Sequence, residues 1–592
     1  MQSEWLVADS LPALLRRRAK DDSIAFRVKR LGLWQSLRWS EYVDKVNALA
    51  AKLADLGVQP GDRVALLCEN RPEWLISDLA IQTAGAVTVG VYTTSSAEQL
   101  AYYLNHSDSV GLIVEDAEQL EKWLNCQTQC PNLKWVAVVE PSDEVTGVLE
   151  FDALVDEGRG LYRSRPEVVD TRLNAVKPHD PALFIYTSGT TGNPKGAVLS
   201  HANLLWAMDS LNIHSPLSAK DELISFLPLS HIVERLISVA APLRYGYTVS
   251  FTENLDTVMT NLQEIRPTIF FAVPRIWEKI HSLVELHMKD AQALKRAAYK
   301  WAMQVASKQR GASVSERRGA ALLAAHTLVI RLLKYRLGLD RVRVAISGAA
   351  PISPDILAYV MSLGIDIREG FGLTESTGLI AINPAKTRLG TVGTAFPGVE
   401  IKIADDGEIL SKSPGNFLHY YKDPEATAEA LEDGWLHTGD VGELDADGYL
   451  SITDRKKDII ITAGGKNIAP QKIENQLKSS VYINDAVVIG DRRPYLTALL
   501  VLDEDNVSHW AAERQLAYST YTDLTQNPEV IALIGAEVEN VNATLARVET
   551  IKKFKILPKR LHHEDGEVTA TLKVKRASIA GKYGHLIEEL YG

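Results

Sequence analysis

The sequence predicts an α/β protein with largely parallel sheets, and three observations point to this class. Short apolar or β-branched runs, as at 63–68, 183–186 and 343–347, recur along the chain with the length of buried strands. Stretches with helical spacing of apolar residues, as at 41–56 and 98–104, lie between such runs, and this alternation is typical of layered α/β folds. The 592 residues are 46% hydrophobic and 23% charged, a composition that can fill several cores and is not that of a disordered chain.

A change in the sequence pattern near residue 454 predicts a domain boundary. The turn-rich segment 434–450 leads into Thr453-Asp-Arg-Lys-Lys-Asp458, and a new α/β stretch follows to the end. We therefore expect an N-terminal domain over 1–453 and a C-terminal domain over 454–592, whose 139 residues are a usual domain size.

Charge and cysteine content argue against several classes of protein. The 64 Lys and Arg against 75 Asp and Glu give a net charge of −11, which argues against nucleic acid as the main partner. Cys68, Cys126 and Cys130 are too few for a disulfide framework, and Cys126 and Cys130 have no second pair with which to hold zinc. No run of 18 apolar residues would span a membrane, and the first apolar residues precede the basic run 16–20, unlike those of a secretory signal. We expect a cytoplasmic protein.

One segment, 289–343, is strongly basic. It contains 13 Lys and Arg against three acidic residues, a local net charge of +10. The stretches 291–306 and 318–337 are rich in Ala, Leu, Lys and Arg, which predicts two helices joined around 311–315. Two interpretations remain open: a pair of solvated helix faces, or a basic amphipathic surface that touches anionic lipid on the inner face of the membrane.

The segment Tyr186-Thr-Ser-Gly-Thr-Thr-Gly-Asn-Pro-Lys-Gly196 predicts a polyphosphate site. Its three glycines allow successive backbone N–H groups to turn toward one anion. Four hydroxyls add donors and Lys195 supplies a full positive charge; the hydroxyls belong to Thr187, Ser188, Thr190 and Thr191. The spacing of a Walker A loop is absent.

This segment resembles the phosphate loop of the AMP-forming adenylate-forming superfamily, which includes acyl-CoA synthetases, luciferases and peptide-synthetase adenylation domains. Further motifs follow in family order: Leu227-Pro-Leu-Ser-His231, Ser347-Gly-Ala-Ala-Pro351, Gly370-Phe-Gly-Leu-Thr-Glu375, Gly434-Trp-Leu-His-Thr-Gly-Asp440, Asp454-Arg-Lys-Lys-Asp458 and Gly464-Gly-Lys-Asn467. Three motifs are similar to those of long-chain fatty acyl-CoA synthetases: His231-Ile-Val-Glu-Arg235, Val273-Pro-Arg-Ile-Trp277 and Thr569-Ala-Thr-Leu-Lys573. The resemblance implies a large N-terminal domain of layered α/β sheets with a β-barrel-like subdomain, and a small mobile α+β C-terminal domain.

The resemblance implies a long-chain fatty acid–CoA ligase that uses ATP and forms AMP. A fatty carboxylate would attack the α-phosphate, pyrophosphate would leave, and the thiol of coenzyme A would then attack the acyl-adenylate. ATP, Mg²⁺, coenzyme A and a long-chain fatty acid are the expected cofactor and substrates, nucleic acid is not a partner, and a homodimer is compatible with the resemblance. Two alternatives remain: a fatty acyl-AMP ligase that delivers the acyl group to a carrier-protein thiol, and a catalytically silent lipid- or nucleotide-binding protein.

The resemblance also implies a nucleotide site. The loop from Thr187 to Lys195 would hold the β- and γ-phosphates, and Glu375 with Thr190 would hold Mg²⁺. Phe371 would stack on adenine, while Asp440 and Arg455 would contact the ribose hydroxyls. The full expected set for ATP and AMP is Thr187, Ser188, Gly189, Thr190, Thr191, Gly192, Lys195, Ala349, Gly370, Phe371, Gly372, Thr374, Asp440 and Arg455.

The acyl tunnel is expected at three residues. By resemblance His231 lines it close to the reacting carboxylate, which makes it a catalytic candidate together with Glu375. Arg235, one helical turn later, would face the same way or form an internal ion pair. Trp277 would gate the tunnel or, alternatively, belong to the core.

The C-terminal domain is expected to supply the main catalytic residue. By resemblance the ammonium of Lys573 bridges the carboxylate and the α-phosphate in the transition state. Many relatives have Pro-x-x-Gly-Lys where this chain has Thr569-Ala-Thr-Leu-Lys573, so Lys575 is the alternative. Lys457 matches the hinge, and Gly464 with Gly465 matches a glycine pair that lets the pantetheine arm of CoA pass.

Overall fold

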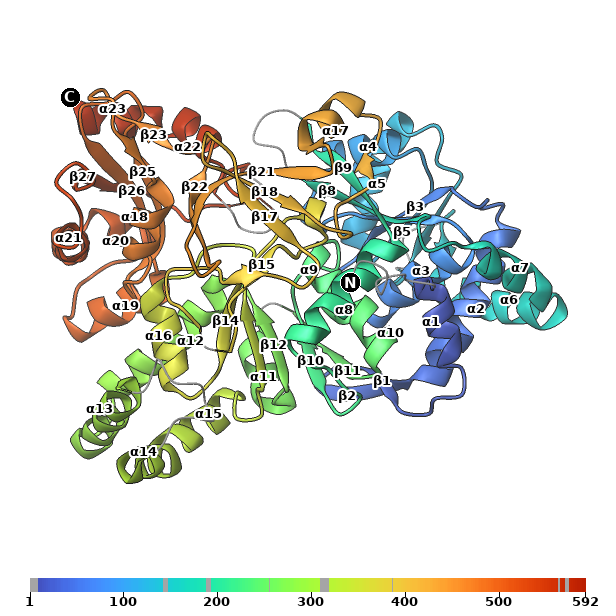
Figure 1. Ribbon diagram of the computed structural model, residues 1–592, viewed down its shortest axis with the longest axis horizontal. Helices are drawn as coiled ribbons and strands as arrows, with labels where there is room; N and C mark the ends of the chain where they lie inside the picture. Colours follow the sequence, from blue (N-terminus) through green and yellow to red (C-terminus); the bar gives the residue numbers. More distant parts are fainter. Residues whose placement is uncertain are drawn as a thin grey trace.

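Two large sheets, both mainly parallel, organise the first two thirds of the chain in the computed structural model (Figure 1). The structure describes residues 9–141, 147–187, 193–254, 256–308, 319–385, 387–562, 565–569 and 574–592. Several central strands are buried along their whole length, as expected for parallel strands covered on both faces. The predicted α/β class with largely parallel sheets is confirmed.

The first sheet has nine strands. Neighbours from β14 to β1 pair in parallel, and the pairs at both edges are antiparallel. In order across the sheet the strands are β16 (Thr394–Ala395), β15 (Ala381–Ile382), β14 (Ile367–Phe371), β13 (Val344–Ser347), β12 (Ile269–Ala272), β10 (Glu222–Ser225), β11 (Thr248–Phe251), β1 (Ile24–Arg30) and β2 (Leu33–Arg38).

The second sheet has eight strands. They are, in order, β19 (His419–Tyr420), β9 (Lys195–Ser200), β8 (Pro181–Thr187), β4 (Val87–Gly90), β3 (Arg63–Leu67), β5 (Ser109–Val114), β6 (Trp135–Val138) and β7 (Leu149–Glu150). Strands β8 to β7 pair in parallel, whereas β9 and β19 add an antiparallel edge. Because Tyr420 pairs with Ala197, a residue distant in sequence reaches the strand that begins with Lys195.

Helices α3 (Pro72–Thr83) and α8 (His201–His214) contribute to the core that joins the two sheets. Both helices are buried on nearly all sides, as expected for helices that contact apolar surface all round. One continuous core contains Leu79 of α3, Trp206 of α8, Ile185 of β8 and Ile346 of β13. Ser200 and Asn203 form a capping box that starts α8 directly after β9.

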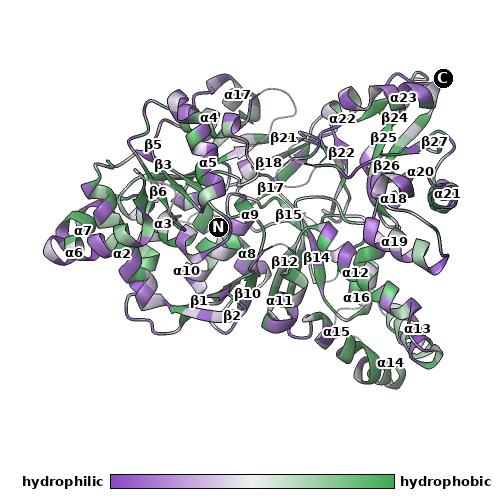
Figure 2. Cartoon of the chain, turned by 180° about the vertical axis from the view of Figure 1, so that it is seen from behind, coloured by the Kyte–Doolittle hydropathy of each residue, from purple (hydrophilic) through white to green (hydrophobic). Residues whose placement is uncertain are grey.

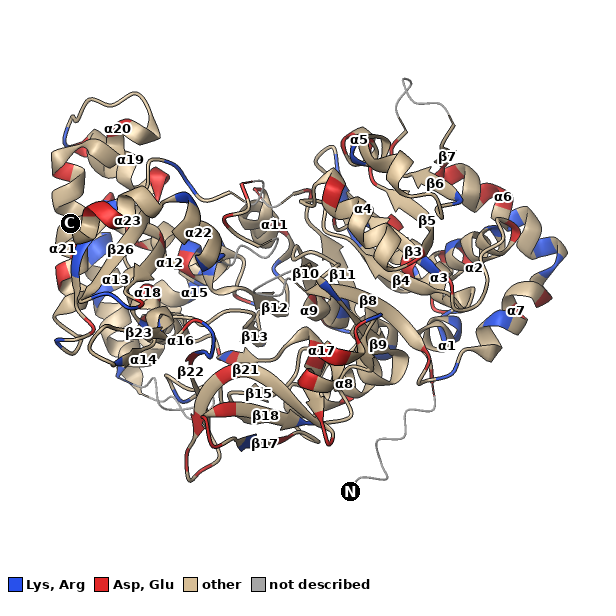
Figure 3. Ribbon diagram, turned by 90° about the horizontal axis from the view of Figure 1, so that it is seen from above, with Lys and Arg blue, Asp and Glu red and all other residues tan. Residues whose placement is uncertain are grey.

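A third sheet of five strands is antiparallel and corresponds to the β-barrel-like subdomain of the expected fold. Its strands are β17 (Glu400–Ile403), β18 (Glu408–Lys412), β21 (Trp435–Leu444), β20 (Leu431–Glu432) and β22 (Leu450–Arg455). Figure 3 shows β17, β18 and β21 along one edge of the molecule, between its two larger bodies. The turn between β21 and β22 is built on Asp445, whose Oδ1 accepts from the N–H of Asp447 and of Tyr449.

The last part of the chain forms a smaller body with cores of its own. It holds the strands β25 (Ile483–Ile489), β26 (Leu496–Leu502) and β27 (Ile551–Ile556), the hairpin β23 (Ile460–Ile461) and β24 (Asn467–Ile468), and the helices α18 (Pro470–Leu477), α19 (Glu504–Glu513), α21 (Pro528–Asn542), α22 (Arg576–Lys582) and α23 (Gly584–Tyr591). A large N-terminal part of layered sheets with a smaller C-terminal α+β part is the predicted architecture.

The basic segment forms two helical rods, as predicted. Helix α12 (Pro274–Lys289) leads into α13 (Ala293–Ser307), and α14 (Ala320–Ala325) continues through the π-helical turn His326–Ile330 into α15 (Arg331–Leu337). Helices α13 and α14 project from the body at the lower left of Figure 1. Among the described residues, no helix combines the length and the apolar character that crossing a bilayer requires.

Candidate active site

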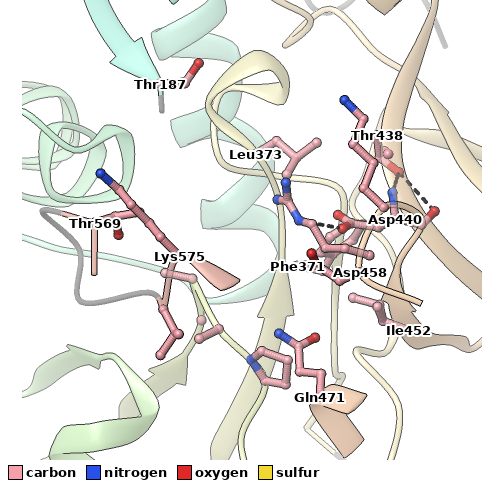
Figure 4. A pocket seen from close by; sticks show the side chains of 18 of the residues that line it. Thr187, Phe371, Leu373, Thr438, Asp440, Ile452, Asp458, Gln471, Thr569 and Lys575 are labelled. Carbon is pink, nitrogen blue, oxygen red and sulfur yellow. Dashed lines mark hydrogen bonds and ion pairs between the residues drawn. The ribbon is translucent and has the colours of Figure 1, made fainter. Parts of the chain in front are cut away.

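A cleft of about 2530 Å³ lies between the N-terminal and C-terminal parts. It opens at the carboxyl ends of β8, β13 and β14, which is where open α/β sheets usually bind ligands. Figure 4 shows Thr187 and Asp440 of the N-terminal part together with Lys575 of the C-terminal part around this cavity.

Tyr420 connects the predicted metal and phosphate residues at one end of the cleft. Its hydroxyl donates to Oε1 of Glu375 at 2.6 Å, and Lys195 Nζ lies 5.2 Å from the centre of its ring. Thr187 Oγ1 lies 3.5 Å from the same Glu375 oxygen. Burial and the nearby Glu375 raise the pKa of Tyr420 far above its usual value, so the phenol stays protonated and acts as a donor.

Sequence reasoning missed Tyr420. The residue belongs to no motif, and it reaches the site only because β19 pairs with β9 at the edge of the eight-stranded sheet. A Tyr-Tyr pair at 420 and 421 in a polar stretch is the only trace in the sequence, and it does not indicate which ring faces the cleft.

The phosphate loop itself lies partly outside the described residues. Ser188, Gly189, Thr190, Thr191 and Gly192 are not described, so their predicted contacts stay predictions. The loop's two ends are fixed by the β8–β9 hairpin, in which Thr187 is the register partner of Lys195. The hydroxyl of Tyr102 donates to the carbonyl of Pro194 at 2.9 Å and anchors the loop on the side of β9.

The expected adenine wall is present at the ends of β13 and β14. Phe371 and Ala349 both line the cleft, and Ala349 has a left-handed φ of +68°, a strained conformation for a residue with a Cβ. At Gly372 a Cβ would lie 2.1 Å from the carbonyl oxygen of Gly378, so only glycine fits. At Gly370 the nearest atom would be 3.7 Å away, so that glycine is not required by the protein's own packing. Thr374 lines the cleft and begins the 3₁₀ turn that carries Glu375.

Asp440 and Arg455 form the predicted pair for the ribose. They are register partners on β21 and β22, with Arg455 Nε 3.0 Å from Asp440 Oδ1. The Asp440 side chain is only 6% exposed, whereas that of Arg455 is 39% exposed, and both residues line the cleft.

His231 lies at the cleft as predicted. It is the N-cap of α9 (Ile232–Arg235), and its Nδ1 accepts from the N–H of Val233 at 3.3 Å, which orients the ring. Beside it the cleft has an apolar wall made of Ile232, Val233, Leu236 and Ile237.

Arg235 and Trp277 do not line this cleft in the described structure. Arg235 is 3% exposed, lies 2.8 Å from Asp78 and stacks over the ring of Trp74, so the internal ion pair is the alternative that holds. Trp277 is fully buried and packs edge to face on Phe270 with ring centres 5.0 Å apart. It packs with Phe270 in the core beside the nine-stranded sheet, which agrees with the core alternative, and the gate stays a prediction.

Lys573 lies outside the described residues, but its neighbours on both sides face the cleft. Thr569, Val574 and Lys575 all line it. The backbone N–H of Lys575 donates to the carbonyl of Glu567, and Lys575 is the N-cap of α22. Lys575 therefore borders the cleft, whereas the position of Lys573 stays a prediction.

The predicted hinge lies where the two parts meet, whereas the predicted glycine pair does not. Lys457 lines the cleft directly after β22. The Asp454 carboxylate accepts from the backbone N–H of Gln471 at 2.9 Å, which ties β22 to the start of α18, and burial raises the pKa of Asp454 to about 6. Gly464 and Gly465 form the exposed turn of the β23–β24 hairpin and do not line the cleft in this arrangement.

Three polar contacts hold the C-terminal part against α12. Arg275 donates to Asn484 Oδ1 at 3.0 Å, and Lys289 donates to the hydroxyl of Tyr482 at 3.1 Å. At the end of the helix Asp290 lies 3.4 Å from His509 Nε2. Contacts of this exposed kind are individually weak, so they are compatible with a change of orientation.

Comparison with known proteins places this geometry in context. Two family models match: AMP-binding enzyme over residues 15–421, and AMP-binding enzyme C-terminal domain over residues 457–592. The chain is 37% identical to the long-chain-fatty-acid–CoA ligase FadD15 of Mycobacterium bovis, with 98% of this chain and 97% of that protein covered. It is 32% identical to the long-chain-fatty-acid–CoA ligase ACSBG2 of Homo sapiens, with 94% and 88% covered. A crystal structure of the anthranilate CoA ligase AuaEII with anthranoyl-AMP shares the fold at a TM-score of 0.76 and 19% identity, with 99% of this chain and 100% of that chain covered.

Proposed function

Because this chain belongs to the family of AMP-binding enzymes, we propose that it is a long-chain fatty acid–CoA ligase. It joins a fatty carboxylate to the α-phosphate of ATP with release of pyrophosphate, and then transfers the acyl group to the thiol of coenzyme A. The observation that carries the proposal is one cleft with a charged end, at Lys195 and Glu375, and an apolar wall beside His231. Such a cleft suits a substrate with a carboxylate head and a long apolar tail.

The charged end binds the triphosphate in this proposal. Lys195 and the loop before it hold the β- and γ-phosphates, whose charge accumulates as pyrophosphate leaves. The Glu375 carboxylate and the Thr187 hydroxyl are hard oxygen donors, which Mg²⁺ prefers, so the residues present fit a magnesium ion. Bound Mg²⁺ would neutralise charge on the leaving phosphates. Tyr420 holds the Glu375 side chain in place through its 2.6 Å hydrogen bond.

The nucleoside lies against the ends of β13, β14 and β21. Phe371 stacks on the adenine, and Gly372 leaves the turn free of a side chain. A carboxylate can accept from both hydroxyls of a ribose, and Asp440 has this role. Arg455 is a positioning residue, because it pairs with Asp440 at 3.0 Å.

The acyl group lies along the apolar wall. His231 stands at the start of this wall and orients the carboxylate toward the α-phosphate, while Ile232, Leu236 and Ile237 contact the chain. Leu211 and Phe396 also line the cleft and extend the apolar surface. A wall of this extent supports a long-chain acid over a short polar one.

The orientation of the C-terminal part supports the first half-reaction. Thr569, Val574 and Lys575 line the cleft, whereas the turn with Gly464 and Gly465 does not. We assign the bridging ammonium to Lys573, with Lys575 as the alternative. Thioester formation then requires the part after Lys457 to rotate so that the glycine turn borders the cleft and the pantetheine arm can enter. In this proposal the two bodies that move relative to each other are residues 1–453 and 454–592, and the acyl acceptor is free CoA. A homodimer stays a prediction from the sequence.

Pyrophosphate release across a panel of carboxylic acids tests the function. We expect release with C16 and C18 acids to exceed release with acetate by at least about a hundredfold, since each methylene buried adds roughly 0.8 kcal/mol. Acyl-CoA should form only when CoA is added. Adenylate formation without any thioester in the presence of CoA would favour a carrier protein as acceptor, and no pyrophosphate release with any acid would contradict the proposal.

A further inference from the structure

The basic segment forms an arm that stands apart from the active site. We call residues 293–308 and 319–337 the helical arm. Its first helix, α13, packs against the second helix through a small core of Ala302, Ala306, Ala325 and Ile330. Tyr299 and Leu337 also pack into a core of the body, but the arm leaves much of both helices in contact with water, and α13 and α14 project from the body (Figure 1).

The arm exposes large apolar side chains that its own packing does not use. On the second helix Leu323 is 67% exposed and Leu328 is 71% exposed, and Leu332 and Tyr335 follow on the next turns. On α13, Leu294 is 84% exposed and Trp301 is 39% exposed. Figure 2 shows α14 almost entirely in the colour of hydrophobic residues. Exposed apolar clusters of this kind mark contact sites rather than ordinary solvated surface.

Basic side chains lie among these apolar ones, and acidic ones do not. Neither 293–308 nor 319–337 contains an Asp or a Glu. The exposed basic residues are Lys295, Arg296, Lys300, Lys308, Arg331 and Arg336, and within the described part of the chain none of them pairs with a carboxylate. The arm is thus a surface of apolar and positively charged groups on a protein whose net charge is −11.

We propose that the helical arm docks on the surface of an anionic lipid bilayer. Leu294, Trp301, Leu328 and Leu332 enter the boundary between headgroups and acyl chains, and the Lys and Arg side chains contact the anionic headgroups. Tryptophan is a residue that favours this interface. A second copy of the chain is a poor occupant of the same surface, because two arms of like charge would repel.

The position of the arm connects the bilayer to the cleft. Arg275 and Glu278 near the start of α12 line the cleft, and the same helix ends at Lys289, just before the arm. Sixteen residues of helix span about 24 Å. Because α12 joins the cleft to the arm over this length, a docked arm would keep the cleft near a membrane, where long-chain acids partition. The docking does not depend on the reaction proposed above.

Sedimentation of the full-length protein with lipid vesicles tests this proposal. The vesicles are phosphatidylcholine alone and an equal mixture of phosphatidylcholine and phosphatidylglycerol, without ATP or fatty acid. We expect binding to the mixed vesicles only, weakening as salt is added. The triple variant Lys300→Gln, Arg331→Gln, Arg336→Gln should bind roughly a hundredfold more weakly, because each basic group near such a surface contributes roughly fivefold.

A matched triple variant removes the same charge elsewhere. Lys20, Arg163 and Lys552 are exposed residues outside the arm, and their substitution by Gln should leave vesicle binding nearly unchanged. For the apolar contacts, Leu328→Asn with Leu332→Asn should weaken binding by more than about tenfold. Leu31→Asn with Leu33→Asn, in the exposed turn of β1 and β2, is the control.

Four results would overturn the proposal. Two concern the vesicles: no binding to the mixed vesicles, or equal binding to both kinds. The third is an equal loss of binding in the arm variants and in their controls. The fourth is a dimer in solution that Leu328→Asn with Leu332→Asn dissociates, while the same variant still binds vesicles. The last result would assign the arm to a second copy. Circular dichroism melting of each variant shows that losses do not come from unfolding.

Discussion

The Tyr420 hydroxyl donates a 2.6 Å hydrogen bond to Glu375, although 45 residues separate them in the sequence. The bond joins the edge of the eight-stranded sheet to the turn after β14, so two elements of the N-terminal part determine where the carboxylate lies. A carboxylate that must hold a metal ion against phosphates needs a fixed position. We therefore assign Tyr420 a positioning role.

Tyr420→Phe should raise the Mg²⁺ concentration needed for half-maximal pyrophosphate release by about three- to tenfold. The reason is that one hydrogen bond to a charged group contributes roughly 1.5–3 kcal/mol, and part of this is recovered by water. The measurement is a Mg²⁺ titration at fixed ATP.

Tyr421→Phe is the matched control for this substitution. Its hydroxyl donates to Asp108 at 2.8 Å, and Tyr421 does not line the cleft. If both variants shift the Mg²⁺ titration equally, the effect comes from the sheet edge and Tyr420 has no positioning role.

Lys573→Ala should slow adenylate formation by about 10²–10³-fold, the usual loss for one electrostatic contact in a transition state. The same variant should still convert supplied oleoyl-AMP and CoA to oleoyl-CoA, because the α-phosphate is not attacked in that step. Lys575→Ala, two residues later on the same cleft-lining segment, is the comparison. A large loss in Lys575→Ala with a small one in Lys573→Ala would exchange the two assignments.

Lys457→Pro should have the opposite effect on the two half-reactions: adenylate forms, but the thioester does not. Proline fixes φ near −65° and removes an N–H, so it restricts rotation of the part after Lys457 without touching the Asp440–Arg455 pair. Since Thr569, Val574 and Lys575 already line the cleft in this arrangement, adenylate should still form and the thioester step should stall. Equal loss of both half-reactions in a folded variant would contradict a hinge at this residue.

The motifs predicted the nucleotide end of the site better than the acyl end. Asp440 and Arg455 were assigned by resemblance to family motifs, and the structure adds that they face each other across the short hairpin of β21 and β22. Tyr420 depends on a strand pairing across the chain, which local patterns do not contain. For Trp277 the motif left a gate and a core residue open, because the sequence does not contain the direction in which α12 turns this side chain.

Trp277→Phe tests the core assignment. The Trp277 Nε1–H has no hydrogen-bond partner among the described residues, so the substitution removes packing alone and should lower stability by about 1–3 kcal/mol. The ratio of rates for C10 and C18 acids should stay at the wild-type value. Ile237→Ala, on the apolar wall of the cleft, should change this ratio with a smaller loss of thermal stability. A changed ratio of the C10 and C18 rates in Trp277→Phe would support a gate at this residue instead.

Glu369 gives the site a pH dependence. It lies on β14 two residues before Phe371, is 7% exposed and lines the cleft. Its Oε1 accepts one weak bond, from the N–H of Ile352 at 3.4 Å, and burial raises its pKa to about 8. The carboxyl is therefore protonated at pH 7, which keeps a negative charge away from the place where a carboxylate and a triphosphate meet.

The sign of the stability effect follows from this raised pKa. An unfolded Glu releases its proton near pH 4.5 and the folded one near pH 8, so the unfolded state binds fewer protons between these values. Glu369 should therefore lower the free energy of unfolding by about 1.4 kcal/mol for each pH unit across that window. Glu369→Gln removes this slope, so its melting temperature relative to wild type should rise from pH 5 to pH 8. Its pyrophosphate release should also persist above pH 8, where ionised Glu369 would repel both substrates in the wild type. If the difference in melting temperature between Glu369→Gln and wild type stays constant with pH, Glu369 is already ionised in the folded protein.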